Sequence, residues 1–393
     1  MEEMIELCAT CLFGLEKFVG EEIDALGYER VETQDGRVTF RGPLSAIARA
    51  NLWLRFAERV FIKMGSFTAT SFEELFQGTK NLPWERWIGP DDAFPVKGHS
   101  VRSALKSIPD MQSIVKKAVV SRLGEEYGIS WFREEAARVQ IEFFVLNDRA
   151  TLLIDTSGDA LYKRGYRKQT GPAPIRETLA AALCRIARPR EDVLFWDPFC
   201  GSGTIPIEAC LMMDNVAPGS FRSFLAEDFL DLPESIWKEA REEARDLMKK
   251  SAFEAFATDI DPAMVDMARA NAASAGVEEH IRFFPKNALG IETHGRRGTV
   301  VCNPPYGERM ETLDKARELY SAMGGHWKNL DRWQIYVICA DDQFQRYFNR
   351  RADNVRKLYN GMLKCFYYQF YKAPGQREVS HRSHEGNRPF RKK

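Results

Sequence analysis

Across residues 1–157, the hydrophobic pattern predicts helices and strands that do not alternate in a regular order. The segments VQIEFFVLND (139–148) and RATLLIDTSG (149–158) alternate apolar and polar positions and meet at an Asn-Asp pair. This pattern predicts two strands joined by a tight turn. A helical pattern runs from about Pro109 to Tyr127, and a strand, a helix and a second strand are expected within residues 1–42. The front of the chain is therefore predicted to be α+β.

From Pro174 onward, helical and strand-like segments alternate regularly. The segment PIRETLAAALCRIAR (174–188) predicts a helix with Pro174 in its first turn. Continuous apolar runs predict strands buried on both faces, and hence a largely parallel sheet: VLFWD, AFATD, IRFFP, TVVCN and WQIYVICA. The segment KLYNGMLKCFYYQF (357–370) predicts a strand pair at the edge of that sheet. The polar, basic residues 372–393 are expected to be disordered.

Composition places the chain among ordinary globular proteins. Of its 393 residues, 44% are hydrophobic and 28% are charged. No run approaches the roughly 20 apolar residues that a membrane span needs. The first residues carry acids where a signal peptide carries lysines, so a cytoplasmic location is expected. The eight cysteines include one close pair, Cys8-x-x-Cys11, without a second pair or nearby histidines, so we expect free thiols and no metal site.

The net charge of zero hides an uneven distribution. Residues 61–190 contain 20 basic and 15 acidic residues, and residues 372–393 contain 7 basic and 2 acidic ones. The remaining segments, 1–60 and 191–371, carry a net negative charge. Basic segments of this kind favour a polyanionic partner, although solvated basic surfaces are also common.

A glycine-containing segment follows the first strand of the regular half. Asp197-Pro-Phe-Cys-Gly-Ser-Gly-Thr204 lies between VLFWD and a predicted helix, where glycines let the backbone approach a ligand closely. The segment lacks the third glycine of the dinucleotide-binding pattern, and no Lys-Ser or Lys-Thr pair follows it as in a P-loop. A nicotinamide cofactor and ATP are therefore both disfavoured.

The next two strands also end in polar residues. Asp259 ends the run AFATD, where its carboxylate could bind both hydroxyls of a ribose. Asp261 and Pro262 instead suit the start of the following helix. Asn287 and Ala288 follow the run IRFFP and offer one more polar side chain at a strand end.

The segment Asn303-Pro304-Pro305-Tyr306 follows the apolar run TVVC. Proline fixes φ and removes an N–H donor, and it pushes the residue before it out of the helical region. The segment therefore can neither be helix nor continue a central strand. We predict a stiff loop at the end of a buried strand, which is where α/β proteins place binding and catalytic groups.

A glycine loop, an acid, a polar side chain and an Asn-Pro-Pro-Tyr loop at four successive strand ends resemble the class I S-adenosylmethionine-dependent methyltransferases. The Asn-Pro-Pro-Tyr segment resembles those that methylate exocyclic amines of bases. In that family the residue at the position of Asn287 is more often Asp, and the amide oxygen would accept the bond from the adenine amine. The resemblance implies a cofactor site made of Asp197, Phe199, Cys200, Gly201, Ser202, Gly203, Thr204, Asp259, Asn287 and Ala288.

The same resemblance makes Asn303, Pro304, Pro305 and Tyr306 the catalytic loop. An aromatic amine is a poor nucleophile because its lone pair is delocalised into the ring. The Asn303 side-chain oxygen and the Pro304 carbonyl would each accept one N–H and aim that lone pair at the methyl group, while the prolines keep both acceptors rigid. Tyr306 would stack on the extruded base. The alternative role for Asn303 is a turn former before proline, and methylation through a cysteine is disfavoured because Cys302 precedes the loop on the buried strand.

The first 157 residues resemble a ferredoxin-like module followed by a THUMP domain, an RNA-binding module of tRNA- and rRNA-modifying enzymes. The stretches ATCLFGLEKFVGEEI and VKGHSVRSALKS carry this resemblance. The stretches LYKRGYRKQTGPAPIRETLAAAL, NVAPGSFRSF, NPPYGER and KLYNGMLKCFYYQF resemble the 23S rRNA guanine-N2 methyltransferases. The enterobacterial relative fuses a second methyltransferase domain after this region, and the modification made by that domain is not expected here. The implied modules are ferredoxin-like (1–42), THUMP (43–157), a Rossmann-like α/β methyltransferase domain with a mostly parallel sheet (158–371) and a basic tail (372–393).

The resemblance predicts methyl transfer from S-adenosylmethionine to guanine N2 of large-subunit ribosomal RNA. The Asn-Pro-Pro-Tyr loop alone does not separate guanine from adenine or cytosine, so an adenine-N6 methyltransferase acting on DNA or RNA is the first alternative. A catalytically inactive RNA-binding protein and an oxidoreductase on a doubly wound fold are further alternatives, and the oligomeric state does not follow from the sequence. Contacts with RNA phosphates are expected from Lys97, Arg102, Lys106, Lys116, Lys117, Lys163, Arg164, Arg167 and Lys168.

Overall fold

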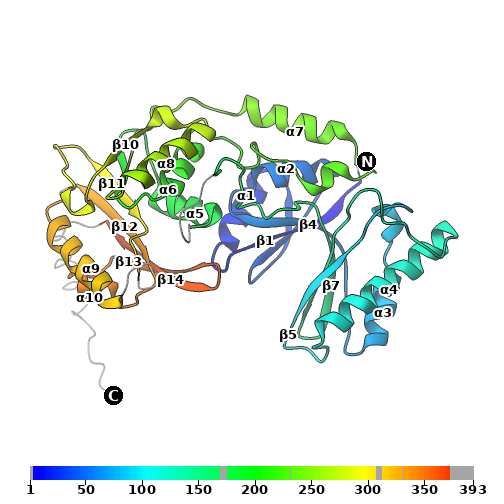
Figure 1. The fold of residues 1–393 in the computed structure, drawn as a ribbon. Helices are drawn as coiled ribbons and strands as arrows, with labels where there is room; N and C mark the ends of the chain where they lie inside the picture. The colour runs from blue at the N-terminus through cyan, green and yellow to red at the C-terminus, as the bar shows by residue number, and fades with distance from the viewer. Residues whose placement is uncertain (1–2, 169–174, 231, 307–311, 331, 372–393) are drawn as a thin grey trace, which may run out of the picture. The chain divides into compact units, whose positions relative to one another are not determined.

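The chain folds into two compact units, each built around its own seven-stranded sheet (Figure 1). The computed structural model describes residues 3–168, 175–230, 232–306, 312–330 and 332–371. The first unit comprises residues 1–165 together with 215–249, and the second comprises 166–214 together with 250–393. The predicted tail and Pro174 lie outside the described residues. The domain boundaries at 42, 157 and 371 stay predictions.

The sheet of the first unit has the strand order β2-β3-β1-β4-β7-β6-β5. Neighbouring strands are antiparallel except β5 and β6, which are parallel. Strand β4 is 12 residues long and pairs with β1 on one side and β7 on the other, so one sheet runs through both predicted front modules. The strands are β1 (Ile5–Cys11), β2 (Glu29–Gln34), β3 (Arg37–Gly42), β4 (Ala57–Thr68), β5 (Val96–Val101), β6 (Ile141–Leu146) and β7 (Arg149–Asp155).

One face of this sheet is apolar and packs against helices. Leu7, Val38 and Ile62 point to this face because side chains alternate along a strand, and all three are buried. The predicted helix from Pro109 is confirmed, and Gly128 ends it with a φ of 68°. The helices of the unit are α1 (Glu16–Ala25), α2 (Ser45–Trp53), α3 (Phe72–Lys80), α4 (Ile108–Tyr127) and α7 (Glu234–Asp246), with short 3-10 turns η1 (Trp84–Arg86) and η2 (Leu225–Asp228).

The predicted hairpin is confirmed as β6 and β7. Asn147 and Asp148 join the strands with φ values of 50° and 63°. Positive φ at both central residues gives the turn a twist that matches the twist of the strands, and Asn and Asp tolerate this conformation better than most residues.

Helix α7 belongs to the first unit although its residues follow α6 of the second unit in the chain. Its buried face carries Ile236 and Trp237, and Glu243 forms two hydrogen bonds, of 2.7 and 2.8 Å, with the guanidinium group of Arg49 on α2. Gly219, before this helix, packs so closely that a Cβ would lie 2.8 Å from the Cα of Leu52. The insertion 215–249 thus completes the core of the unit that residues 1–165 form.

The sheet of the second unit has the order β10-β9-β8-β11-β12-β14-β13 and confirms the predicted Rossmann-like, mostly parallel architecture. The antiparallel strands β13 and β14 confirm the predicted edge pair. Helices α5, α6 and α8 lie on one side of the sheet, and α9 and α10 lie on the other (Figure 1). The strands are β8 (Leu194–Asp197), β9 (Ala255–Asp259), β10 (Ile281–Pro285), β11 (Gly298–Cys302), β12 (Trp333–Cys339), β13 (Asn354–Asn360) and β14 (Leu363–Phe370).

The first helix of this unit begins later than the sequence predicted. Helix α5 starts at Glu177, with Arg176 as its N-cap residue, and the predicted position of Pro174 lies outside the described residues. The helices are α5 (Glu177–Ala187), α6 (Thr204–Met213), α8 (Pro262–Ser274), α9 (Leu313–Trp327) and α10 (Phe344–Tyr347), with 3-10 turns η3 (Glu278–His280) and η4 (Ala288–Gly290).

A buried group of hydrogen-bonded side chains in the second unit lies where the chain leaves and re-enters that unit around the insertion 215–249. Asp214, the last residue before it, accepts hydrogen bonds from the backbone N–H (3.0 Å) and hydroxyl (2.5 Å) of Ser251. Its other carboxylate oxygen lies 2.8 Å from Nε2 of His280. The two chain ends that flank the insertion are therefore held together.

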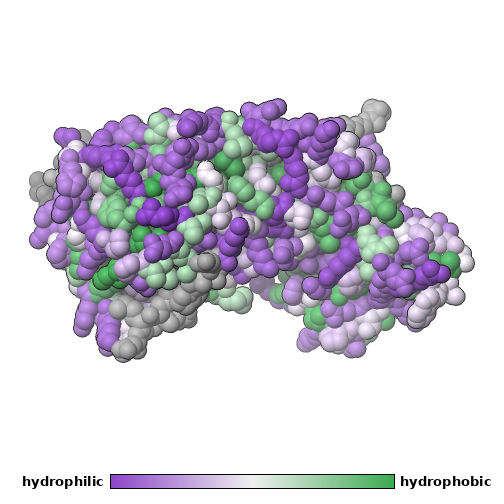
Figure 2. Space-filling view, turned by 45° about the horizontal axis from the view of Figure 1, so that its top comes forward, coloured by the Kyte–Doolittle hydropathy of each residue, from purple (hydrophilic) through white to green (hydrophobic). Residues whose placement is uncertain are grey.

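The surface seen in Figure 2 is mostly hydrophilic, with scattered apolar patches. Across the described ranges, no helix has the length and apolar character that crossing a bilayer requires.

We predict that Trp237→Ala destabilises the first unit. The Trp237 ring is 4% exposed and stacks on Phe224 with a centroid distance of 5.4 Å, and truncation of a buried Trp typically costs about 3–5 kcal/mol. Denaturant unfolding, with hydrogen exchange to locate the effect, should show faster exchange in α2 and β4. The exposed neighbour Lys238→Ala is the control. Faster exchange confined to the second unit's sheet would contradict the assignment of α7.

Candidate active site

Four strand ends of the second unit carry the groups that the sequence predicted. In the sheet, β8 lies between β9 and β11. The chain moves outward from β8 through β9 to β10 and then returns to the other side of β8 as β11, so the strand order reverses there. Ligands of α/β proteins bind at such a point, outside the carboxyl ends of the strands. The glycine loop 197–203 and the proline loop 303–306 follow the two strands that flank it.

The glycine loop is held against the end of β9 and the middle of α8. Cys200 donates its backbone N–H to the Thr258 carbonyl at 3.0 Å, and Gly201 donates to Oδ2 of Asp259 at 3.0 Å. Gly203 has a φ of 82°, and a Cβ there would lie 2.9 Å from Cβ of Ala268. Position 203 therefore requires glycine for two reasons, the positive φ and the close approach to Ala268.

Two carboxyl groups, Asp197 and Asp259, lie at the ends of adjacent strands. Asp197 is 1% exposed, and one oxygen accepts the backbone N–H of Phe199 at 3.1 Å. Burial, together with the nearby charge of Asp259, raises the pKa of Asp197 well above its usual range. The oxygens of Asp259 accept backbone N–H groups of Gly201 and Asp261, and each keeps a lone pair for a hydroxyl group. The pair therefore favours a positively charged ligand.

The third strand end provides a short 3-10 turn. Asn287 is exposed, and its side-chain oxygen accepts the backbone N–H of Leu289 at 2.9 Å. The carbonyl of Ala288 accepts the indole N–H of Trp327 at 2.9 Å. The contact of Asn287 with an adenine amine stays a prediction, and it would have to use the second lone pair of an oxygen that already caps this turn.

The proline loop is anchored by a residue that the sequence did not single out. The hydroxyl of Tyr320, on α9, donates to the Pro305 carbonyl at 3.1 Å, and Sγ of Cys339 on β12 lies 3.3 Å from the same hydroxyl. Tyr320 is fully buried. Its helical spacing predicts only a core position, so no signal in the sequence distinguishes this role.

The predicted catalytic residues occupy this loop with different exposure. Asn303 is half-buried, Pro304 is buried, and Tyr306 is 5% exposed and belongs to the apolar cluster beneath the loop. Stacking of Tyr306 on a base stays a prediction, and it requires the ring to become more exposed than it is here. Burial raises the pKa of the Cys302 thiol well above its usual range, so this cysteine is a poor nucleophile.

The predicted RNA-contacting side chains differ in accessibility. Arg164 is 1% exposed and donates to the carbonyls of Leu161 and Arg55, so the prediction of a phosphate contact is wrong for it. Its guanidinium group instead satisfies buried backbone oxygens. Six of the side chains predicted to contact RNA are exposed, namely Lys97, Arg102, Lys106, Lys117, Lys163 and Lys168.

Two further predicted phosphate contacts are engaged within the fold. Lys116 donates to the Phe94 carbonyl at 3.0 Å and pairs with Glu134. Arg167 pairs with the buried Glu177 at 3.0 Å, in the second unit. Both cations already have acceptors, so a phosphate would compete with existing bonds.

The chain matches three family models. The RMKL-like methyltransferase domain matches residues 164–369, the RlmL ferredoxin-like domain matches residues 6–61, and the THUMP domain matches residues 69–155.

Relatives extend over most of the chain. "Putative RNA methyltransferase YpsC" of Bacillus subtilis is 42% identical over 368 residues, which cover 93% of this chain and 95% of that protein. Ribosomal RNA large subunit methyltransferase K/L of Shewanella sp. (strain ANA-3) is 31% identical and covers 92% of this chain, which spans about half (52%) of that relative. The solved structure of SMU.472 in complex with SAH is 38% identical, with a TM-score of 0.87, and covers 94% of this chain and 99% of that one.

The site fits the cationic cofactor that the resemblance implied. The buried Asp197 and the half-buried Asp259 complement its positive charge, and the space beside Gly201 is open. The fold and site define an S-adenosylmethionine-dependent methyltransferase, whose cofactor supplies a methyl group on a sulfonium centre. Within that class, the chain belongs to the RMKL-like methyltransferase family and carries ferredoxin-like and THUMP domains in front.

We predict that Asp259→Ala weakens cofactor binding by about tenfold or more, because charge-assisted hydrogen bonds are worth roughly 1.5–3 kcal/mol. This loss would combine the predicted ribose contacts of Asp259 with the hydrogen bond that holds Gly201. Calorimetry with S-adenosylmethionine measures it, and Asp266→Ala, which removes an exposed acid on α8, is the control. Unchanged affinity would show that Asp259 only flanks the helix.

Tyr320→Phe removes one hydroxyl without changing the ring. Loss of its bond to Pro305 should lower turnover about fivefold, the equivalent of roughly 1 kcal/mol, while cofactor affinity stays unchanged. Tyr336→Phe, whose hydroxyl bonds Gln334, is the matched control. Equal turnover in both variants would rule out a positioning role for Tyr320.

Proposed function

We propose that this protein transfers a methyl group from S-adenosylmethionine to the exocyclic N2 amine of guanine in large-subunit ribosomal RNA. The observation that carries the proposal is the Asn303-Pro304 segment, which lies at the strand-order reversal beside the cofactor loop. An enzyme that methylates a base amine needs hydrogen-bond acceptors at this position, because the amine has protons to hold and little nucleophilicity of its own.

The residues of the loop would orient the amine. The Asn303 carboxamide oxygen and the Pro304 carbonyl each accept one N–H, so the amine lone pair points toward the methyl donor. The proton that the amine loses on methylation leaves to water, because the loop supplies dipoles and no strong base. Rate enhancement then comes from preorganised acceptors and alignment. The Tyr320 hydroxyl supports this geometry by fixing the carbonyl of Pro305.

RNA is proposed as the substrate because the chain has a THUMP domain and because its relatives are named RNA methyltransferases. Guanine N2 and the large-subunit RNA rest on the resemblance to the guanine-N2 enzymes and on the K/L relatives, of which this chain spans about half. The exposed cations of the front half supply the electrostatic attraction that RNA binding needs.

Adenine N6 is the second candidate target, because the Asn-Pro-Pro-Tyr loop presents the same two acceptors to either amine. Mass spectrometry of ribosomal RNA from cells with and without the gene separates the two. Loss of N2-methylguanine in the deletion strain supports the proposal. Loss of N6-methyladenine, in RNA or in genomic DNA, would replace guanine as the target.

We predict that Asn303→Ala lowers the turnover number about 100-fold or more, because one preorganised acceptor is removed. Cofactor affinity should stay near normal, since the glycine loop and Asp259 hold the cofactor. Methylation of an rRNA fragment and calorimetry with S-adenosylmethionine measure the two effects, and Asn354→Ala on β13 is the control. A parallel loss of cofactor binding would place Asn303 in the cofactor site instead.

A further inference from the structure

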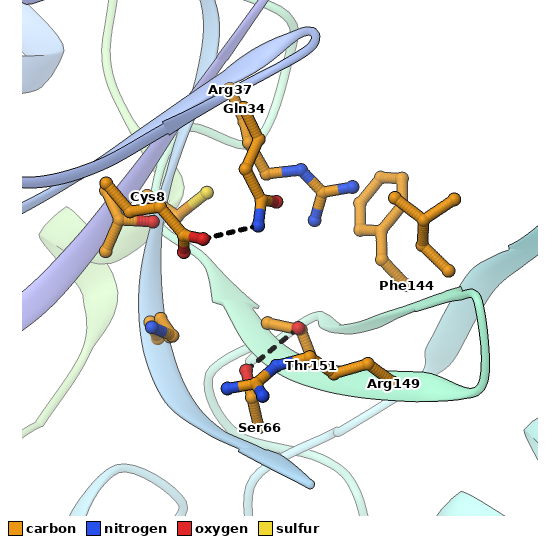
Figure 3. A pocket seen from close by; sticks show the side chains of 11 residues that line it. Cys8, Gln34, Arg37, Ser66, Phe144, Arg149 and Thr151 are labelled. Carbon is orange, nitrogen blue, oxygen red and sulfur yellow. Dashed lines mark hydrogen bonds between the residues drawn. The ribbon is translucent and has the colours of Figure 1, made fainter. Parts of the chain in front are cut away.

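A pocket opens on the sheet of the first unit (Figure 3). Its lining comes from β1, β2, β3, β4, β6 and β7, so residues from the ferredoxin-like match and the THUMP match both contribute. These side chains alternate with the buried apolar ones that face the helices. The pocket is separate from the candidate active site, which lies in the second unit. We call it the sheet pocket.

An apolar cluster lies next to the sheet pocket, and one aromatic ring packed against it, Phe144, lines the pocket. Cys8, Phe61 and Leu153 form a small buried cluster, against which the half-buried Phe144 packs. The guanidinium carbon of Arg37 lies 4.7 Å from the centre of the Phe144 ring, and the His99 ring lies 5.6 Å away. The guanidinium group of Arg37 lies over the Phe144 ring, and such a stacked planar pair is a surface on which a nucleic-acid base can stack.

The rim of the sheet pocket is mainly positive. Figure 3 shows Arg37 extending toward Phe144 on one side, with Arg149 beside Ser66 and Thr151 on the other. Neither arginine forms an ion pair with another residue in the described part of the chain. The third lining cation, Lys63, pairs with Glu6 at 2.9 Å. The one lining acid is Glu32.

We propose that the sheet pocket binds an unpaired nucleotide of the RNA substrate. The base stacks beside Phe144 and Arg37, and Arg149 contacts the adjacent phosphate. The Ser66 and Thr151 hydroxyls, 2.9 Å apart, keep a free hydrogen and free lone pairs for a ribose hydroxyl. The proposal rests on the proposed RNA substrate and adds a second contact point, distinct from the methylated base.

An unpaired nucleotide suits this pocket better than a duplex or a protein. Base stacking on a side chain requires a base that has left its helix, whereas duplex RNA is contacted along its backbone. An anionic ligand complements the guanidinium groups of Arg37 and Arg149, which form no ion pair in the described part of the chain, and the aromatic ring adds a planar contact that a phosphate alone would not use.

The test compares Arg37→Ala, Arg149→Ala and Phe144→Ala with wild type in the full-length protein. The probe is a labelled single-stranded RNA from the rRNA substrate region, followed by fluorescence anisotropy at several salt concentrations. Each variant should bind about tenfold more weakly, and each arginine variant should lower the salt dependence by about one phosphate contact. Arg245→Ala, which removes an exposed arginine on α7, is the matched control.

Two further readouts separate this proposal from the proposed function. Calorimetry with S-adenosylmethionine should give wild-type affinity for every variant, and methylation of an rRNA fragment should show a raised KM with an unchanged turnover number. Wild-type RNA affinity in Arg149→Ala and Arg37→Ala would overturn the sheet pocket proposal while leaving the enzyme's function intact. Preferential binding of single-stranded DNA, lost in the same variants, would overturn the RNA assignment of the pocket. Absence of RNA methylation by the wild-type enzyme would instead overturn the proposed function.

Discussion

The hydrogen bond from the Gly201 N–H to the Asp259 carboxylate is the contact on which the arrangement of the active site depends. It joins the loop after β8 to the end of β9 and so fixes the backbone beside a second acid, Asp197. Burial, with a smaller contribution from the charge of Asp259, raises the pKa of Asp197 well above its usual range, and the two carboxylates repel each other when both are ionised. A bound cation relieves that repulsion. The site thus gains electrostatic stability only when its ligand is present.

The proline loop, where we propose that the substrate binds, is held in place by different contacts. The proline loop has few rotatable bonds of its own, and the Tyr320 hydroxyl holds its carbonyl from below. That hydroxyl lies against Cys339 on the neighbouring strand, so the loop is tied to the sheet through α9. The acceptors proposed for the amine therefore rest on the packed core of the second unit. Asp259 thus lies at the end of β9 on one side of β8, whereas the proline loop follows β11 on the other side.

The sequence predicted those parts of the fold that local pattern determines. Continuous apolar runs identified β8 to β12, and the Asn147-Asp148 pair identified the hairpin, because both signals lie within a few residues. The insertion 215–249 was not predicted, because Trp237 and Glu243 find their partners across long separations that no short pattern records. The burial of Arg164 was missed for a related reason. A basic side chain in a basic segment resembles a phosphate contact until the backbone carbonyls around it are known.

The residues of the candidate site also divide into those that the sequence identified and those that it did not. The glycine loop, Asp259 and the proline loop could be named from sequence because their residue types are chemically constrained. Tyr320 and the sheet pocket could not, since a helical tyrosine and alternating strand residues are typical of many cores. Their roles depend on which strands lie side by side, and the strand order of neither sheet is written in any single segment.

The insertion also sets the order in which the protein can fold during synthesis. Residues 3–165 build the first sheet and most of its helices, yet the surface of α2 stays uncovered until α7 has emerged from the ribosome. By then the chain has already produced β8 and α6 of the second unit, whose neighbours β9 to β14 are still to come. Neither unit can close its core before the other has begun. From this chain order we expect the folding of the two units to overlap in time, unlike the usual sequence in which an N-terminal domain finishes first.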